Sequence, residues 1–339
     1  MRVKYSFEII EDIPWDDIES TYDSNVYKTH NWFCHLKESC HVQPFIVTIK
    51  CNNDMVGWLV AGRITRFGFK IVASPFEGWA TSYQGLSLIK KTSKEDRLDI
   101  IIQLQQYLFK ECGIHFFQVS DWKLDYEDIG NNNVYTEPIN SYLLDISPSI
   151  EDLFKSFKQK SCQYSIHKAQ KLGVIVKEPD DLAAFGHEYY KQLEDVFLKQ
   201  NLKPTYNEKR VQSLLHSLDR QKDLIILEAL HPETKKCMAC IIFILHNGIG
   251  FYWGASSWRE YQKLCPNEIL MFEGIKILKE RGCKQLEMEG IRPYKEKYNP
   301  IQYSKPKLVF AKFPIIITFK GWAKKLYYGL RKVLSYFRK

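Results

Sequence analysis

The sequence contains no apolar run of the roughly 20 residues that a membrane-spanning helix needs. Its most apolar late stretch, residues 313–317, is far too short. Residues 1–15 lack the apolar core of a secretion signal. We therefore expect a cytoplasmic protein without a spanning segment.

A disulfide framework and a metal site are also missing from the pattern. The nine cysteines are odd in number and irregularly spaced, which favours reduced thiols. Cys237 and Cys240 form a lone CxxC, and a zinc site would need two further ligands at comparable spacing. A thioredoxin-like CxxC opens a helix, whereas this one opens the apolar run CIIFILH. We expect two buried strand cysteines, no metal and no bound cofactor.

Net positive charge is scarce outside the end of the chain. Of the net charge of +8, seven charges come from the residues after Thr318, a stretch without acids. Apolar residues recur there at three- and four-residue spacing, as in a helix that lies on an anionic membrane. We expect a basic amphipathic helix over residues 313–339, with residues 318–339 making peripheral contact with the inner face of the plasma membrane.

What is present is a repeated order of elements. Each half reads as helices, antiparallel strands, a helix and a strand, although no residue-level repeat is visible. In the first half, strands near residues 45–51 and 55–64 flank the turn 52–54, a hairpin signal. The pattern predicts an α/β (α+β) protein with domains over residues 1–146 and 147–312. Each is expected to be a mixed, mainly antiparallel sheet flanked by helices.

The stretch from Phe251 to Pro300 predicts the site. An aromatic strand ends at Trp253-Gly254, Pro266-Asn267 opens an amphipathic helix, and a strand over residues 284–289 leads into the polar segment 292–299. In α/β proteins such strand ends gather around ligands. No Ser/His/Asp or Cys/His array for covalent catalysis accompanies them.

Several segments of the second half follow one family's order and spacing. They are HKAQKLGV, VFLKQNLKP, YWGAS, PNEILMFEGIKILKERG, LEMEG and YKEKYN. This set resembles the FemABX and BioF2-like acyltransferase group, which has a double GNAT-type fold. The resemblance covers about residues 151–310 well, and the first half matches in plan alone.

The sequence departs from that family at identifiable points. His167 replaces the usual Arg, Asn299 replaces a Gly, and Glu287-Met288-Glu289-Gly290 replaces Asp-x-Gly-Gly. The pyrophosphate loop of simple acetyl-CoA enzymes is missing before Pro266, and no long helical arm fits within residues 181–218. These changes bear on the substrate more than on the fold.

The resemblance implies an N-acyl or aminoacyl transferase that forms an amide on a cell-envelope precursor. The donor would be aminoacyl-tRNA or acyl-CoA as co-substrate, and the acceptor an amine of a muropeptide or amino sugar, lipid- or nucleotide-linked. It also implies that the last helix packs back on the first domain. We expect a monomer.

The roles of single residues follow from the same comparison and from elementary chemistry. By resemblance, Lys295 stabilises the acyl carbonyl or the developing oxyanion. Glu287 and Glu289, two apart on a strand, would share one face, and either could take the amine's proton. The residues expected to bind substrate are Trp253, Gly254, Tyr294, Arg292 and Asn267.

A second interpretation belongs to another class of protein. A non-catalytic RNA- or membrane-binding protein on a degenerate double GNAT scaffold would use the basic tail and the basic segment 158–172. Its binding would weaken steeply with salt. Transfer of a labelled acyl group to an amine distinguishes the two.

Overall fold

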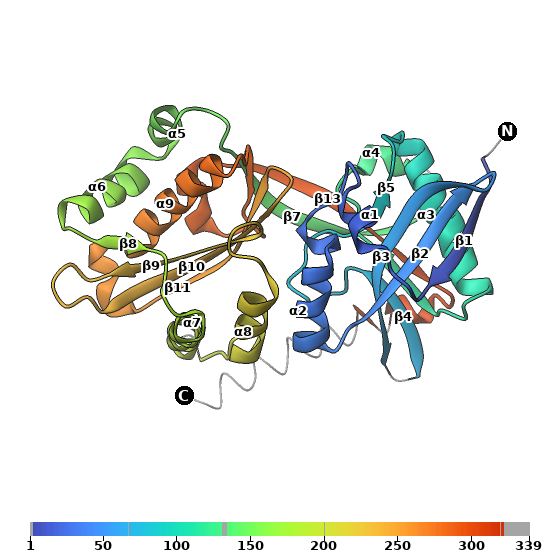
Figure 1. Cartoon of the computed structure of the whole chain (residues 1–339), viewed down its shortest axis with the longest axis horizontal. Helices are drawn as coiled ribbons and strands as arrows, with labels where there is room; N and C mark the ends of the chain where they lie inside the picture. The colour runs from blue at the N-terminus through green and yellow to red at the C-terminus, as the bar shows by residue number, and fades with distance from the viewer. Residues whose placement is uncertain (1–2, 67, 131–133, 200, 319, 322–339) are drawn as a thin grey trace. The chain divides into compact units, whose positions relative to one another are not determined.

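The computed structural model describes residues 3–66, 68–130, 134–199, 201–318 and 320–321 (Figure 1). The chain divides into two compact units. The first unit contains the residues up to Ile139 and those from Ser304 onward, and the second unit is formed mainly by Asn140–Tyr303. The boundaries fall inside two strands, β7 (Tyr135–Asp145) and β13 (Ile301–Ala311).

Within the first unit, the strands follow the order β1-β2-β3-β4-β6-β13. Neighbours are antiparallel except for the parallel pair β4 and β6. The short β5 pairs with β3. The remaining bounds are β1 (Tyr5–Ile10), β2 (Gln43–Cys51), β3 (Asp54–Arg66), β4 (Phe69–Ser74), β5 (Leu86–Leu88) and β6 (Phe116–Val119).

The predicted hairpin of the first half is confirmed as β2 and β3. Asn52 and Asn53, which link the two strands, have φ angles of 50° and 70°. Asparagine tolerates this left-handed conformation, which a tight hairpin turn requires at both central residues. The turn chemistry visible in the sequence therefore sets the register of the pair.

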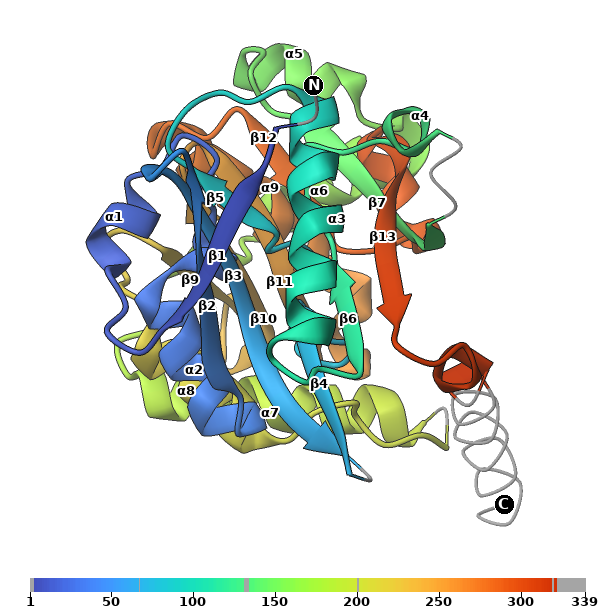
Figure 2. The same ribbon diagram turned by 90° about the vertical axis from the view of Figure 1, so that its right-hand side faces the viewer.

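One long helix, α3 (Lys94–Lys110), lies along the sheet of the first unit (Figure 2). The Ser93 side chain accepts a hydrogen bond from Asp96 N at 3.0 Å, which caps its first turn. Leu98, Ile101 and Leu104 are buried in the core beneath it. The other helical segments of this unit are α1 (Trp15–Glu19), η1 (Val26–Lys28), α2 (His30–Cys40) and α4 (Tyr126–Ile129).

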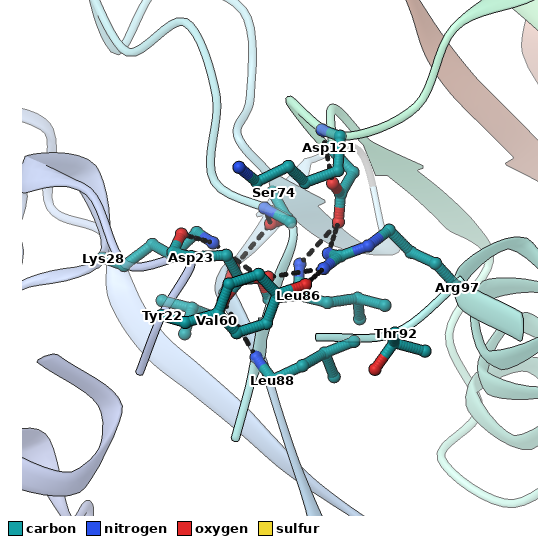
Figure 3. A network of polar contacts seen from close by, with 12 residues as sticks. Tyr22, Asp23, Lys28, Val60, Ser74, Leu86, Leu88, Thr92, Arg97 and Asp121 are labelled. Atoms are coloured by element: carbon teal, nitrogen blue, oxygen red, sulfur yellow. Dashed lines mark hydrogen bonds and ion pairs between the residues drawn. The ribbon is translucent and has the colours of Figure 1, made fainter. Parts of the chain in front are cut away.

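A buried network of charges joins α3 to the segment around β5 (Figure 3). Arg97 donates to Asp121 at 2.8 Å and to Asp23 at 2.6 Å, and all three side chains are at most 2% exposed. Asp121 in turn accepts from Leu86 N, and Asp23 accepts from Leu88 N. Burial alone would raise the pKa of Asp121, but Arg97 and Lys28 hold it below its usual value.

The second unit has the strand order β7-β12-β11-β10-β9-β8, in which β11 and β12 are parallel and the other neighbours are antiparallel. Its strands, besides β7, are β8 (Ile175–Lys177), β9 (Leu224–Leu230), β10 (Cys237–His246), β11 (Ile249–Ser257) and β12 (Gln285–Glu287). Figure 1 shows α5, α6 and α9 over one face of this sheet and α7 and α8 over the other. The helical segments are α5 (Ile150–Ser156), η2 (Gln159–Gln163), α6 (Tyr164–Lys171), α7 (Leu182–Leu198), α8 (Glu208–Ser217), η3 (Arg259–Leu264), α9 (Pro266–Glu280) and η4 (Pro293–Tyr298).

The central helix of this unit, α9, confirms the amphipathic helix expected after Pro266. Proline occupies its first turn, where a missing N–H costs nothing. A Cβ on Gly274 would come within 2.2 Å of the Phe243 ring, so glycine lets the helix approach β10 closely. The basic segment 158–172 contains the π-helical η2 followed by α6.

These features confirm the expected fold class: mixed, mainly antiparallel sheets flanked by helices. The units differ from the expected domains 1–146 and 147–312, because β7 and β13 each contribute to both units. Of the expected C-terminal helix, residues 315–318 and 320–321 are helical, and the rest lies outside the described residues. No helix in the described part of the chain is both long and apolar enough to cross a bilayer.

Candidate functional site

The parallel pair at the centre of the second unit is short. Its register joins Ile249, Gly250 and Phe251 of β11 to Gln285, Leu286 and Glu287 of β12, and β12 ends there. On the other side of β11, Gly254 faces Ile242 and Tyr252 faces Phe243, so Trp253 is the extra residue of a β-bulge. Bulges redirect side chains and are frequent beside functional sites. The pairing of β11 with β12 ends at Phe251, just before the β-bulge at Trp253.

Trp253 lies among tyrosine side chains. Its ring centroid is 5.3 Å from that of Tyr206 and 5.9 Å from that of Tyr189. The indole Nε1 is buried and has no hydrogen-bond partner among the described residues. Leaving such a donor unsatisfied costs about 1–3 kcal/mol, which an accepting ligand atom would recover.

Gly254 is explained by its close packing against Tyr189 of α7. A Cβ at this position would come within 2.4 Å of the Tyr189 hydroxyl oxygen. That hydroxyl lies 3.0 Å from the hydroxyl of Tyr206. Burial raises the pKa of Tyr206 to about 12, so the hydroxyl stays protonated at neutral pH. The Tyr189 phenol lies against Gly254, which was expected to bind substrate, and that assignment stays a prediction.

The turn that follows β12, residues 288–290, is held from its N–H side by Glu287. The Glu287 carboxylate accepts from Glu289 N at 3.0 Å and from the hydroxyls of Ser141 and Tyr303. Ser141 Oγ also accepts from Gly290 N at 2.8 Å. Glu287 is fully buried, and burial followed by the charge of Glu289 raises its pKa to about 7.

Lys295 holds the same turn from its carbonyl side. Its Nζ donates to the carbonyl oxygens of Met288, Glu289 and Gly290, the latter two at 2.7 and 3.2 Å. The ammonium also lies 5.1 Å from the Tyr252 ring centroid, a cation–π contact. Burial lowers the pKa of Lys295 to about 8 against the opposing effect of Glu289 and Glu287.

The three expected catalytic residues thus meet around one turn, but not as strand alternation suggested. β12 ends at Glu287, and Glu289 has a left-handed backbone with φ of 56°. The rule that residues two apart share a face therefore does not extend to Glu289. Glu287 is enclosed by donors on both oxygens, whereas Glu289 is only half-buried.

The remaining predicted binding residues lie on the flanking elements. Tyr294 is 50% exposed, and its hydroxyl is 3.5 Å from that of Tyr252. Arg292 is exposed just before η4. Asn267 in the first turn of α9 donates to Ser257 Oγ at 2.9 Å, which ties this helix to the end of β11. Their assignment as binding residues stays a prediction.

Sequence reasoning missed four residues that complete this arrangement: Ser141, Tyr303, Tyr189 and Tyr206. Ser141 precedes Glu287 by 146 residues, and Tyr303 follows it after the helical segment η4. No motif marks either residue. Tyr189 and Tyr206 come from α7 and from the segment before α8. Only the glycine after Trp253 gave a signal, since it indicates that something large lies against the strand.

No group of three or more His, Cys, Asp or Glu side chains in the described ranges is placed to hold a metal ion.

Comparison with known proteins bears on the fold. Residues 156–297 match the family described as Acetyltransferase (GNAT) domain. The crystal structure of FemX superposes with a TM-score of 0.71 at 8% identity, covering 90% of this chain and 97% of that one. A conserved protein of unknown function from Bacteroides thetaiotaomicron VPI-5482 gives 0.58 at 11% identity, covering 91% and 100%.

No curated protein matches the sequence. The resemblance carried by the sequence motifs is confirmed at the level of fold: the chain has the fold of FemX, and its second half contains a GNAT-type domain.

Proposed function

We propose that the protein is an acyltransferase that forms an amide on an amine from an activated ester or thioester, either aminoacyl-tRNA or acyl-CoA. The observation that carries the proposal is the turn 288–290, clamped by Lys295 and Glu287, where β12 ends beside the bulge of β11. Such a turn offers fixed charges beside the point where the pairing of β11 with β12 ends.

The reaction needs no covalent enzyme intermediate, because the donor already carries a leaving group. The amine nitrogen attacks the acyl carbon, its oxygen becomes an oxyanion, and the tetrahedral adduct expels the thiolate or the ribose oxygen. The amine gives up a proton, and the leaving group takes one. The protein has to hold the two reactants together and stabilise the oxyanion.

Lys295 supplies the positive charge for that oxyanion. Its Nζ donates to three carbonyl oxygens, and the bond to Gly290 O, at 3.2 Å, is the longest of the three. Exchange of that bond for the acyl oxygen would bring the charge to the reacting atom without moving the lysine. Its low exposure keeps the interaction strong.

Glu289 is the better candidate for the proton acceptor. It is half-buried on the turn, so a substrate ammonium can reach it directly or through water. Glu287, with both oxygens engaged, positions the turn instead. Trp253 Nε1 would donate to an oxygen of the substrate, Tyr294 would cover it, and the exposed Arg292 would bind a phosphate of donor or acceptor.

A cell-envelope acceptor is supported by the likeness to FemX and by the motifs of the second half. The fold alone does not select the acceptor, so the experiment must. The full chain is incubated with labelled aminoacyl-tRNA or labelled acyl-CoA together with muropeptide, amino-sugar and nucleotide-linked amines. We expect one label to move into an amide. Failure of every donor to transfer to any amine, with a folded protein, would refute the proposal.

A further inference from the structure

The lone CxxC of the sequence has an unusual geometry in β10. Cys237 faces Leu230 of β9, whereas Ala239 faces Ala229, so Met238 is an extra residue in the strand. In a regular strand, residues three apart point to opposite faces. The bulge changes this alternation and brings Cys237 Sγ to 3.5 Å from Cys240 Sγ. A disulfide needs a separation of about 2 Å, so a small movement would join the two sulfurs.

The two thiols differ in their access to solvent. Cys240 is fully buried, whereas Cys237 is half-buried and lines a cavity of about 580 Å³ within the second unit. Phe185, Trp258 and Tyr261 also line this cavity. A small oxidant can therefore reach Cys237 first, with Cys240 directly behind it.

We propose that Cys237 and Cys240 form a reversible disulfide and that this pair is an oxidative modification site of the protein. A hydroperoxide oxidises the Cys237 thiol to a sulfenic acid and is itself reduced to an alcohol, or to water if it is hydrogen peroxide. The Cys240 sulfur then attacks the Cys237 sulfur, the S–S bond forms, and the sulfenic oxygen leaves as water with the remaining proton. A dithiol reductant reverses the change.

The pair is connected to the candidate site through Gln192 of α7. Gln192 Nε2 lies 3.5 Å from Cys237 Sγ and donates to Glu188 at 3.0 Å, while Gln192 Oε1 accepts from Ser256 of β11 at 3.2 Å. The same helix places Tyr189 against Gly254. Drawing Cys237 toward Cys240 weakens the link to Gln192 and loosens α7 on β11. An effect on acyl transfer rests on the proposed function, whereas disulfide formation does not.

The test uses the full reduced chain treated with hydrogen peroxide, then denatured and alkylated without reduction. We expect the tryptic peptide 237–259 to lose two hydrogen atoms and both alkylation sites together, with full recovery after dithiothreitol. Burial raises the pKa of Cys240, so closure should become faster as pH rises. Cys265→Ser, which removes another half-buried thiol, should behave like the wild type.

Cys240→Ser should leave Cys237 as a sulfenic acid that dimedone traps, and Cys237→Ser should leave Cys240 alkylatable after denaturation. Separate oxidation of Cys237 beyond the sulfenic acid, with Cys240 still alkylated, would overturn the proposal, as would no oxidation of either. Hydrogen exchange in residues 182–198 should increase on oxidation and return on reduction. These readouts hold even if no acyl transfer is found, so the two proposals fail separately.

Discussion

Lys295 and Glu287 both bind the backbone of Glu289. Lys295 Nζ donates to Glu289 O at 2.7 Å, and the Glu287 carboxylate accepts from Glu289 N at 3.0 Å. A buried ammonium and a buried carboxylate thus share Glu289 as their common partner. Glu287 also opposes the lowering of the Lys295 pKa by burial.

Replacing Lys295 should abolish most of the transfer. Lys295→Met keeps the length of the side chain and removes the charge, and we expect kcat to fall roughly 100- to 1,000-fold, as for loss of one oxyanion donor. Lys297→Met is the control on the same η4 segment, where the lysine pairs with Glu268 instead. It should keep most of the activity. Full activity in Lys295→Met would exclude the role given to Lys295; circular dichroism and the unfolding midpoint check that the variant is folded.

The Glu287 carboxyl should make stability depend on pH. Its folded pKa of about 7 lies above its ordinary value of 4.5, so the folded state binds this proton more tightly than the unfolded state. Its contribution is therefore complete below pH 4.5 and is lost as pH rises to about 7, by roughly 3 kcal/mol. Urea unfolding of wild type and Glu287→Gln over that range measures it. The wild type should lose unfolding free energy relative to Glu287→Gln as pH rises. A difference that does not change with pH would contradict this.

Gly254→Ala should be destabilising because the new methyl group meets the Tyr189 hydroxyl. We expect a loss of about 1–3 kcal/mol in the free energy of unfolding, typical of overpacking. Tyr189→Phe removes the obstructing oxygen, and the next atom of that ring lies 3.6 Å from the added Cβ. The double variant should therefore lose less than the sum of the two single changes. Additive losses would show that Tyr189 is not the obstacle.

The Arg97 network predicts a larger effect in the first unit. Arg97→Met leaves Asp23 and Asp121 buried without their shared cation, which should cost about 3–5 kcal/mol of unfolding free energy. Lys94→Met on the same helix breaks exposed ion pairs with Asp125 and Asp128 and should cost at most about 1 kcal/mol. Chemical denaturation of both variants makes the comparison, and equal losses would refute a special role for the buried cluster.

Much of the fold could be predicted because it depends on short-range patterns. The Asn52-Asn53 turn and the proline that opens α9 are local signals. The strand ends of the site were also visible. What could not be predicted was the exit from β12: Glu289 adopts a left-handed backbone in a turn that Ser141, 149 residues before Gly290, helps to hold.

The same limit applies to the interpretation of single residues. The sequence identifies Trp253 as an aromatic residue at a strand end. It does not show the β-bulge at this residue, which depends on the register between β10 and β11. Cys237 and Cys240 were expected to be two buried strand cysteines. Of the two, Cys240 is buried. A β-bulge at Met238, which no sequence motif marks, places Cys237 at the cavity.

The position of β13 has a consequence for how the chain is made. Residues 308–311 of this strand pair with residues 116–119 of β6, and nearly two hundred residues separate them. During synthesis, β6 has no β13 to pair with until the whole of Asn140–Tyr303 has been translated. A ribosome-bound chain that stops at Ile139 carries an unfinished sheet edge, which is a template for aggregation. Chaperone dependence should therefore be greatest in this interval and end once residue 311 has left the exit tunnel.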